Sequence, residues 1–309
     1  MINNLFIFII AFIAIIKGAT MATKYAARLA QSFHLSKFTI GFIIVAVISI
    51  LPETFIAINA AIEGVPSFGL GTLFGSNVTD LTLVFVAMIF FAGRCLRVEG
   101  RILKNHIVYP YILLIPLILG LNGHFSRLEG LALIIAGASF YYLVYKNGDN
   151  VKTPSINGNN KYGHLLMLLL SMIILLVGSH FVVVSATGLA NYFQISPILI
   201  GMLIVGLGTT MPELFFSLKS VKKRDECLAI GDILGTVLAD ATIVVGILAL
   251  ISPFSFPQKI VYITGLFMVV ASFILFRFMK TGHVLTKKEA YLLLVYWLVF
   301  VLVEFVANR

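Results

Sequence analysis

Long apolar stretches alternate with short polar breaks along the whole chain. A helix needs roughly 20 mostly apolar residues to cross the hydrocarbon core of a bilayer, and ten stretches approach that length. The pattern therefore predicts an all-α integral membrane protein with ten transmembrane helices. The expected spans cover residues 4–31, 36–62, 67–92, 106–122, 128–145, 164–191, 196–219, 227–251, 258–277 and 287–306.

Composition agrees with this interpretation. Hydrophobic residues make up 60% of the chain and charged residues 11%, with a mean hydropathy of +1.05, whereas soluble domains carry about 25% charged residues. The first stretch, Leu5 to Ile16, lacks the basic flank and the small-residue cleavage pattern of a signal peptide. We therefore expect it to be a span of the protein.

Basic residues gather on one side of the expected topology. If the N-terminus faces outside, 19 of the 22 Lys and Arg residues fall on the cytoplasmic side, and Arg127, Lys259 and Arg309 fall on the other. Cytoplasmic loops carry such an excess, so the net charge of +9 requires no nucleic-acid partner. We expect a multi-pass protein of the cytoplasmic (cell) membrane with its N-terminus outside; an organelle membrane is the alternative.

The chain repeats itself at a shift of 160 residues. Gly18 to Asp80 aligns with Gly178 to Asp240 without a gap, and 16 of the 63 positions are identical. The identities include four glycine pairs, Pro52/Pro212, Glu53/Glu213 and Asp80/Asp240, which hydrophobic bias alone would not match. We predict a first five-helix repeat over residues 1–145, a cytoplasmic linker over 146–163, rich in turn-forming residues, and a second five-helix repeat over 164–309.

Five spans in each repeat give the two copies opposite orientations in the membrane. Secondary transporters use this inverted plan and bind their substrates near the midplane, between the copies. Channels and enzymes can also contain repeats, so the function depends on the polar residues inside the spans.

Four paired carboxylates lie inside expected spans: Glu53, Asp80, Glu213 and Asp240. Each ionised group at the bilayer centre costs about 2.5–3.5 kcal/mol on insertion scales. No Lys or Arg lies nearby in the same spans, so we expect bound cations or protons to balance these charges. Carboxyls buried for structure alone are the alternative, which the pairing between repeats disfavours.

A hydroxyl precedes each acid by one helical turn, in the pairs Ser49/Glu53, Ser76/Asp80, Thr209/Glu213 and Thr236/Asp240. Residues at i and i+4 share a helix face, so four helices are expected to present oxygen atoms to a common centre. Hard cations favour such a shell, since Ca²⁺ takes about 6–8 oxygen ligands.

Proline and glycine shape the same segments. Pro52 and Pro212 directly precede the two glutamates and lack the N–H that would bond the carbonyl four residues back, and such irregular backbone is tolerated where it lines a cavity. The G-x-x-x-G spacings, Gly71/Gly75 and Gly231/Gly235, are expected to serve close helix packing. Lys17 and His180 lie inside long spans, and the sequence predicts no role for either.

These segments resemble the two alpha-repeats of the cation/Ca²⁺ exchanger superfamily, with the compact prokaryotic Na⁺/Ca²⁺ exchangers nearest. The resemblance rests on Leu51-Pro52-Glu53 with Gly71-Thr-Leu-Phe-Gly75-Ser76-Asn77, and on Gly208-Thr-Thr-Met-Pro-Glu213 with Gly231-Asp-Ile-Leu-Gly235-Thr236, and it covers nearly the whole chain. It implies exchange of three Na⁺ for one Ca²⁺ by alternating access, through sliding of the first and sixth helices.

The resemblance also implies roles for single residues. Glu53 and Glu213 would be shared ligands of Ca²⁺ and of the counter-ions, and Ser49 and Thr209 would contribute backbone carbonyls. Flanking Na⁺ sites would include Ser76, Thr210 and Thr236, while Asp80 and Asp240 would complete the centre.

Three departures from the family pattern leave the coupling ion open. Ile50 lacks the hydroxyl that Thr210 retains, Thr72 and Asp232 replace the usual asparagines, and Asp80 stands where Na⁺/Ca²⁺ relatives commonly have asparagine. Four acids around one dication require at least one proton, because close like charges oppose ionisation. An H⁺-coupled antiporter of Ca²⁺ or another cation is therefore the alternative to Na⁺/Ca²⁺ exchange.

Other classes of function fit the sequence less well. A cation channel or a non-transporting membrane sensor is the alternative of a different class. A channel needs a continuous polar path, whereas the polar residues cluster at one depth. No nucleophile–base arrangement or cofactor motif is present, so we expect neither an enzyme nor a cofactor. Transported inorganic cations and the lipid bilayer are the expected partners, with no protein partner evident.

Overall fold

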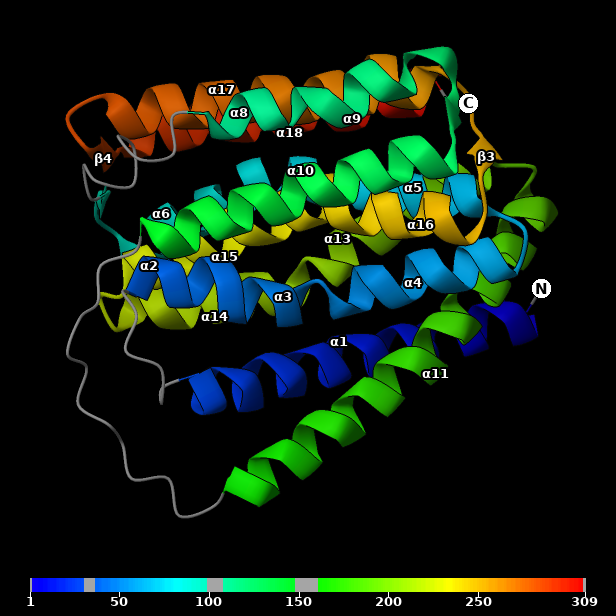
Figure 1. The fold of residues 1–309 in the computed structure, drawn as a ribbon, viewed down its shortest axis with the longest axis horizontal. Coiled ribbons are helices and arrows are strands. Elements are labelled where there is room, and N and C mark those ends of the chain that lie inside the picture. Colours follow the sequence, from blue (N-terminus) through cyan, green and yellow to red (C-terminus); the bar gives the residue numbers. More distant parts are fainter. Residues whose placement is uncertain (1, 31–36, 99–107, 148–160, 308–309) are drawn as a thin grey trace.

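Long helices run side by side through the molecule, and the N- and C-termini lie at the same end of the bundle (Figure 1). The computed structural model describes residues 2–30, 37–98, 108–147 and 161–307. Within these ranges, nine helical stretches are long and apolar enough to cross a membrane, and Tyr109–Asn122 is a tenth, shorter apolar stretch. The nine cover Asn4–Met21, Ile40–Ile62, Pro66–Ala92, Arg127–Lys146, Gly163–Phe193, Pro197–Lys222, Glu226–Ile251, Ile260–Lys280 and Lys287–Ala307.

The predicted spans are confirmed in number and place within the described ranges, with one difference in form. The fourth span is interrupted: α8 (Tyr109–Ile112) and α9 (Leu114–Leu119) meet at Leu113, and the 3₁₀ turn η3 (Gly120–Asn122) follows. Pro116 explains the interruption, because it has no N–H for the carbonyl of Ile112. The predicted linker falls largely on residues 148–160, which lie outside the described residues.

The repeat is visible in the helix boundaries, since equivalent elements begin and end within one residue of a 160-residue shift. In the first half the core elements are η1 (Ile40–Val45), α3 (Ala46–Ser49), α4 (Leu51–Ile62), α5 (Pro66–Thr79), η2 (Asp80–Val84) and α6 (Phe85–Ala92), after the short α2 (Lys37–Thr39). Their counterparts are η4 (Gly201–Val205), α13 (Gly206–Thr209), α14 (Met211–Lys222), α15 (Glu226–Ala239), η5 (Asp240–Val244) and α16 (Val245–Ile251), after α12 (Pro197–Ile200).

The two repeats interlock through the predicted glycines. A Cβ on Gly75 of α5 would lie 2.4 Å from the carbonyl oxygen of Met202 in η4, and a Cβ on Gly235 of α15 would lie 2.4 Å from that of Phe42 in η1. Each glycine-rich helix therefore packs backbone to backbone on the other repeat. The packing role predicted for these glycines is confirmed.

Short strands join the repeats at both ends of the bundle. At one end β1 (Leu96–Arg97) pairs antiparallel with β4 (Val284–Leu285). At the other end, which holds both termini, β2 (His124–Phe125) pairs antiparallel with β3 (Phe254–Ser255) (Figure 1).

Equivalent helices of the two repeats start in the same way after these strands. Ser126 and Glu129 form a capping box at the start of α10 (Arg127–Lys146), and Thr286 and Glu289 make the same contacts at the start of α18 (Lys287–Ala307). The Ser/Thr hydroxyl and the Glu carboxylate each satisfy a backbone N–H that the first turn leaves unpaired. Between β3 and β4, the π-helical η6 (Ile260–Gly265) leads into α17 (Leu266–Lys280).

The helices α1 (Ile2–Ala30) and α11 (Lys161–Phe193) form a pair at one side of the bundle, where α11 runs obliquely (Figure 1). The equivalent glycines Gly18 and Gly178 each face the other helix, with a Cβ position 3.0 Å from Ile174 and from Ile15, respectively. Their length, 29 and 33 residues, fits the tilt expected of long spans. Lys17 is exposed on α1.

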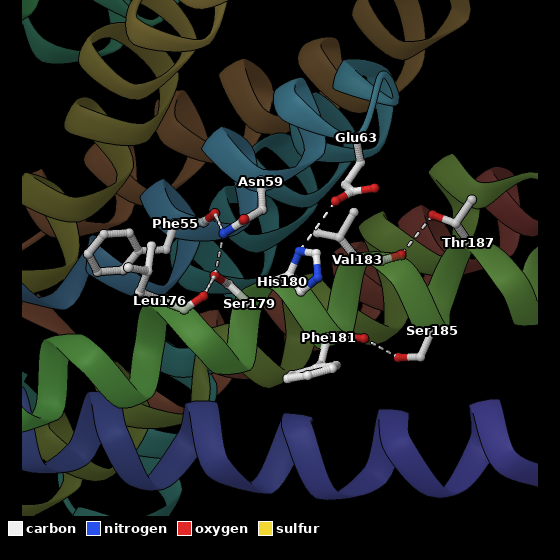
Figure 2. A network of polar contacts seen from close by, with 10 residues as sticks. All are labelled: Phe55, Asn59, Glu63, Leu176, Ser179, His180, Phe181, Val183, Ser185 and Thr187. Carbon is white, nitrogen blue, oxygen red and sulfur yellow. Dashed lines mark hydrogen bonds and ion pairs between the residues drawn. The ribbon is translucent and has the colours of Figure 1, made fainter.

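A polar network joins α11 to α4 near the end that holds the termini (Figure 2). The Asn59 side-chain amide donates to Ser179 Oγ at 2.7 Å and to the Phe55 carbonyl at 2.9 Å. One residue further along α11, His180 Nδ1 lies 3.3 Å from Glu63 Oε1. The sequence predicted no role for His180, and the structure places it in this contact between helices.

Candidate functional site

Both helices that carry the site glutamates break directly before them. α3 ends at Ser49 and α4 begins at Leu51, while α13 ends at Thr209 and α14 begins at Met211. The breaks fall at Ile50 and Thr210, two residues before Pro52 and Pro212, which cannot donate a backbone hydrogen bond to the preceding turn. The interruptions expected from the prolines are confirmed in both repeats.

The two site aspartates also stand at irregular helix positions. Asp80 opens the π-helical turn η2 and Asp240 opens η5. Single π-helical turns inside α-helices interrupt the regular ladder and are frequent at functional sites. Each of the four predicted acids therefore stands next to a change in helix geometry.

The structure brings the four predicted carboxylates together at the contact between the repeats. The side chains are at most 1% exposed. Asp80 interacts electrostatically with Glu53, Glu213 interacts with Glu53 and Asp80, and Asp240 interacts with the same two. The four acids therefore lie within electrostatic range of one another, and their role as a common cation-binding centre stays a prediction.

Hydroxyl groups surround the carboxylates, and several direct their protons away from them. Thr209 and Thr210 both donate to the Gly206 carbonyl, at 3.1 and 2.9 Å, and Ser76 donates to the Leu73 carbonyl at 3.0 Å. A hydroxyl that donates elsewhere keeps two lone pairs available. Such oxygens can bind a cation without bringing a proton close to it.

The two repeats meet at these hydroxyls. The Thr209 side chain interacts with the Glu53 carboxylate, and the Thr210 side chain interacts with the Asp80 carboxylate. Hydroxyls of the second repeat thus contact acids of the first, so the site is built jointly by both.

Many oxygen atoms of the site are buried without a hydrogen-bond partner. They include seven carboxylate oxygens: Glu53 Oε2, Asp80 Oδ1, Glu213 Oε1 and Oε2, Asp232 Oδ2, and Asp240 Oδ1 and Oδ2. Thr236 Oγ1 is unpartnered as well. Buried polar atoms are normally satisfied, so this concentration of unpartnered oxygens makes the region the candidate cation-binding site.

The arrangement combines several kinds of oxygen. Within the described ranges, no three His, Cys, Asp or Glu side chains are grouped closely enough to hold a metal ion by themselves. A cation bound here would therefore also use hydroxyl and carbonyl oxygens, which suits the hard ions that accept mixed oxygen shells.

Sequence reasoning missed four polar residues inside the bundle. Asp232 is fully buried on α15 and interacts with Asp80 and Glu213. Ser217 Oγ and Asn77 Oδ1 are buried and unpartnered, and Glu304 on α18 is buried with a hydrogen bond from Thr264. Asp232 and Glu304 were missed because neither has an acidic counterpart at the 160-residue shift. Both lie inside expected spans, so counting every carboxylate inside a span would have found them.

The chain is similar to known membrane proteins over most of its length. It is 27% identical to the inner membrane protein YrbG of Escherichia coli strain K12, with 79% of each chain covered. It is 22% identical to the sodium/calcium exchanger MaX1 of Methanosarcina acetivorans over 98% of each chain.

A solved structure has the same fold. The sodium-calcium exchanger NCX_Mj soaked with Na⁺ and Sr²⁺ superimposes with a TM-score of 0.72 at 24% sequence identity, covering 96% of this chain and 97% of that chain. The fold class of ten helices in two inverted repeats is thereby confirmed.

The sequence profile of the family described as "Sodium/calcium exchanger protein" matches the chain twice, once in each half. The matches cover residues 3–146 and 163–306, which are again 160 residues apart and together account for most of the 309 residues. This multi-pass membrane protein therefore belongs to the sodium/calcium exchanger protein family.

Proposed function

We propose that this chain is a secondary-active antiporter that exchanges Na⁺ for Ca²⁺ across the membrane. The observation that carries the proposal is the set of seven buried carboxylate oxygens without partners at the contact between the repeats. Leaving these groups ionised and unpaired at membrane depth is costly, and bound cations remove that cost. Family membership and the relatives named sodium/calcium exchanger support the same ions.

The centre offers ligands to more than one cation. Glu53 and Glu213 would bind Ca²⁺ together with oxygens of Ser49 and Thr209, and the same glutamates would serve the counter-ion in turn. Ser76, Thr210 and Thr236 would complete flanking Na⁺ sites, while Asp80 and Asp240 close the centre. One ligand set shared by competing cations makes binding mutually exclusive, as antiport requires.

Alternating access would come from movement of α1 and α11 against the remaining helices. These two helices pack on each other through Gly18 and Gly178 and share an apolar cluster that also includes Ile56 and Ala60 of α4. We further propose residues 1–145 and 164–309 as the two repeat domains, in the cell membrane, with the N-terminus outside. The basic residues Arg94, Arg277, Lys280, Lys287 and Lys288 lie near the β1–β4 end, opposite the termini, which supports a cytoplasmic β1–β4 end.

The test is uptake of radiolabelled Ca²⁺ into Na⁺-loaded proteoliposomes that are diluted into Na⁺-free medium. The wild-type protein should take up Ca²⁺, and Glu213→Gln should lower uptake by at least about 100-fold, because one charged ligand is lost. Glu289→Gln is the matched control, since Gln also supports a capping box and Glu289 lies at the start of α18, outside the site. Retained uptake in Glu213→Gln would contradict the assignment.

A proton-coupled antiporter is the second candidate. Asp80 stands beside the other acids, and Ile50 lacks the hydroxyl that Thr210 supplies. If protons are the coupling ion, a pH gradient without Na⁺ should drive Ca²⁺ uptake in the same vesicles. Uptake that depends on the Na⁺ gradient alone excludes this candidate.

A further inference from the structure

Asp232 lies against the first repeat, where the family pattern provides no acid. Ser49 Oγ of α3 donates to Asp232 Oδ1 of α15 at 3.0 Å, and both side chains are fully buried. The second carboxylate oxygen, Oδ2, has no hydrogen-bond partner. Asp232 also interacts electrostatically with Asp80 and Glu213, so its carboxylate lies within range of the other acids.

The same face of α15 carries further unpartnered oxygens. Asp232, Thr236 and Asp240 follow one another at intervals of four residues, which places them on one helix face. Thr236 Oγ1 and both carboxylate oxygens of Asp240 are buried without partners. Asp232 therefore extends the row of cation-binding oxygens by one turn toward α3.

The equivalent place in the other half has a different chemistry. The pseudo-symmetric counterparts of Ser49 and Asp232 are Thr209 and Thr72, and the Thr72 hydroxyl donates to the Phe68 carbonyl at 3.0 Å. The carboxylate is thus present only where α15 meets α3. Ile50, adjacent to Ser49, also lies at this contact. It lacks the hydroxyl that Thr210 supplies at the equivalent contact, beside Thr209.

We propose that Asp232, together with Ser49 and Thr236, forms a subsite for a monovalent cation of the Na⁺ class and replaces the oxygen ligand that Ile50 lacks. One carboxylate and two hydroxyls carry a single negative charge, which matches a monovalent ion. The divalent ion would bind at Glu53 and Glu213 instead. This inference rests on the proposed function, because it names a further ligand of the same centre.

The test measures binding to the purified full-length protein by competition of Na⁺ against radiolabelled Ca²⁺. Asp232→Asn keeps the side-chain size and an oxygen that accepts from Ser49, but removes the charge. We expect Na⁺ to compete about ten-fold more weakly, as the loss of one charged ligand predicts, with a lower Hill coefficient. Ca²⁺ binding in the absence of Na⁺ should change less.

A second variant separates ion binding from a purely structural hydrogen bond. Adding Ile50→Thr to Asp232→Asn restores an oxygen beside Ser49 and should recover part of the Na⁺ competition. Competition curves of Asp232→Asn that match the wild-type curves would overturn the inference. If Asp232→Asn fails to fold, Asp232→Thr introduces the residue of its counterpart Thr72 and also removes the charge, and unchanged Na⁺ competition in that variant would equally overturn the inference.

The outcomes distinguish this inference from the proposed function. If the wild-type protein bound neither Ca²⁺ nor Na⁺, both would be wrong. If the wild-type protein bound both ions and Glu213→Gln lost them while Asp232→Asn bound as the wild type does, the assignment of Asp232 alone would be wrong.

Discussion

Two helix contacts are equivalent by the 160-residue repeat: α11 packs on α4, and α1 packs on α14. Their side-chain chemistry differs. The first contains the buried Asn59–Ser179 hydrogen bond and the His180–Glu63 pair (Figure 2). At the second, the 160-residue shift places Lys219 and Lys223 on the α14 side and Ala19 and Thr20 on α1. An amide–hydroxyl hydrogen bond and an imidazole–carboxylate contact between the side chains at these positions are therefore specific to the α11–α4 contact.

The two repeats share the residues that shape the centre of the protein, but they differ in the polar contacts that α1 and α11 make with α14 and α4. Positions that set backbone geometry and charge at the centre are matched, including the prolines, the packing glycines and the acids that open the π-helical turns. Polar groups between helices are not matched. In an inverted-repeat transporter the two access states are related by exchanging the conformations of the repeats. Contacts of different strength at the two ends therefore favour one state, and a difference of 1 kcal/mol changes the ratio of the states about five-fold.

The largest expected effect comes from a shared feature. Gly75→Ala and Gly235→Ala each place a Cβ 2.4 Å from a carbonyl oxygen of the other repeat, so the repeats must separate. We expect each change to cost about 3 kcal/mol, with similar losses of thermal stability for the purified protein. Gly64→Ala is the control: its Cβ meets open space at a φ of +75°, which costs about 1 kcal/mol. Losses no larger than that of the control would show that the close packing is not required.

A smaller effect is expected where the repeats differ beside the site. Gly208 lies under the Phe12 ring, where a Cβ would fall 1.7 Å from the ring, whereas the counterpart of Gly208 is Ile48. Gly208→Ala should cost about 2 kcal/mol through overpacking and should lower Ca²⁺ uptake. Adding Phe12→Ala should restore part of both. Strictly additive losses in the double variant would mean that the two residues do not act on each other.

The smallest effect should come from the contact between α11 and α4. Ser179→Ala removes an interhelical hydrogen bond worth about 1 kcal/mol in membrane proteins and should shift the population toward a wider separation of α4 and α11. Spin labels at positions 62 and 192, in a background without Cys95 and Cys227, report that distance. His180→Gln should shift it less, because both partners of the ion pair are partly exposed. An unchanged distance distribution in Ser179→Ala would show that the bond does not bias the states.

The sequence predicted the spans, the repeat and the four paired acids because each leaves a local or periodic signal. Glu53 and Glu213 lie in apolar stretches next to proline, and the 160-residue shift aligns them. The same use of symmetry explains what was missed. Asp232 has Thr72 as its counterpart and Glu304 has Val144, so a search for paired acids passes over both.

Contacts between the repeats could not be predicted from the pattern alone. The Ser49–Asp232 hydrogen bond joins residues 183 positions apart, and its geometry depends on how α15 crosses α3. The packing of Phe12 against Gly208 depends on the position of α1, which no local signal fixes. The π-helical turns that begin at Asp80 and Asp240 also left no recognisable mark, because a π-turn is a change in the helical hydrogen-bond ladder that no residue type specifies.

The interlocked glycine helices have a consequence for how the protein is made. Gly75 of α5 and Gly235 of α15 each pack on backbone of the other half, so neither half has a complete interior by itself. During synthesis the first half enters the bilayer before its partner exists, and Glu53 and Asp80 then lack the hydroxyls of Thr209 and Thr210. The acids of the first half must therefore stay protonated, hydrated or shielded by the insertion machinery until the second half arrives, which makes assembly of the two halves the decisive step of biogenesis.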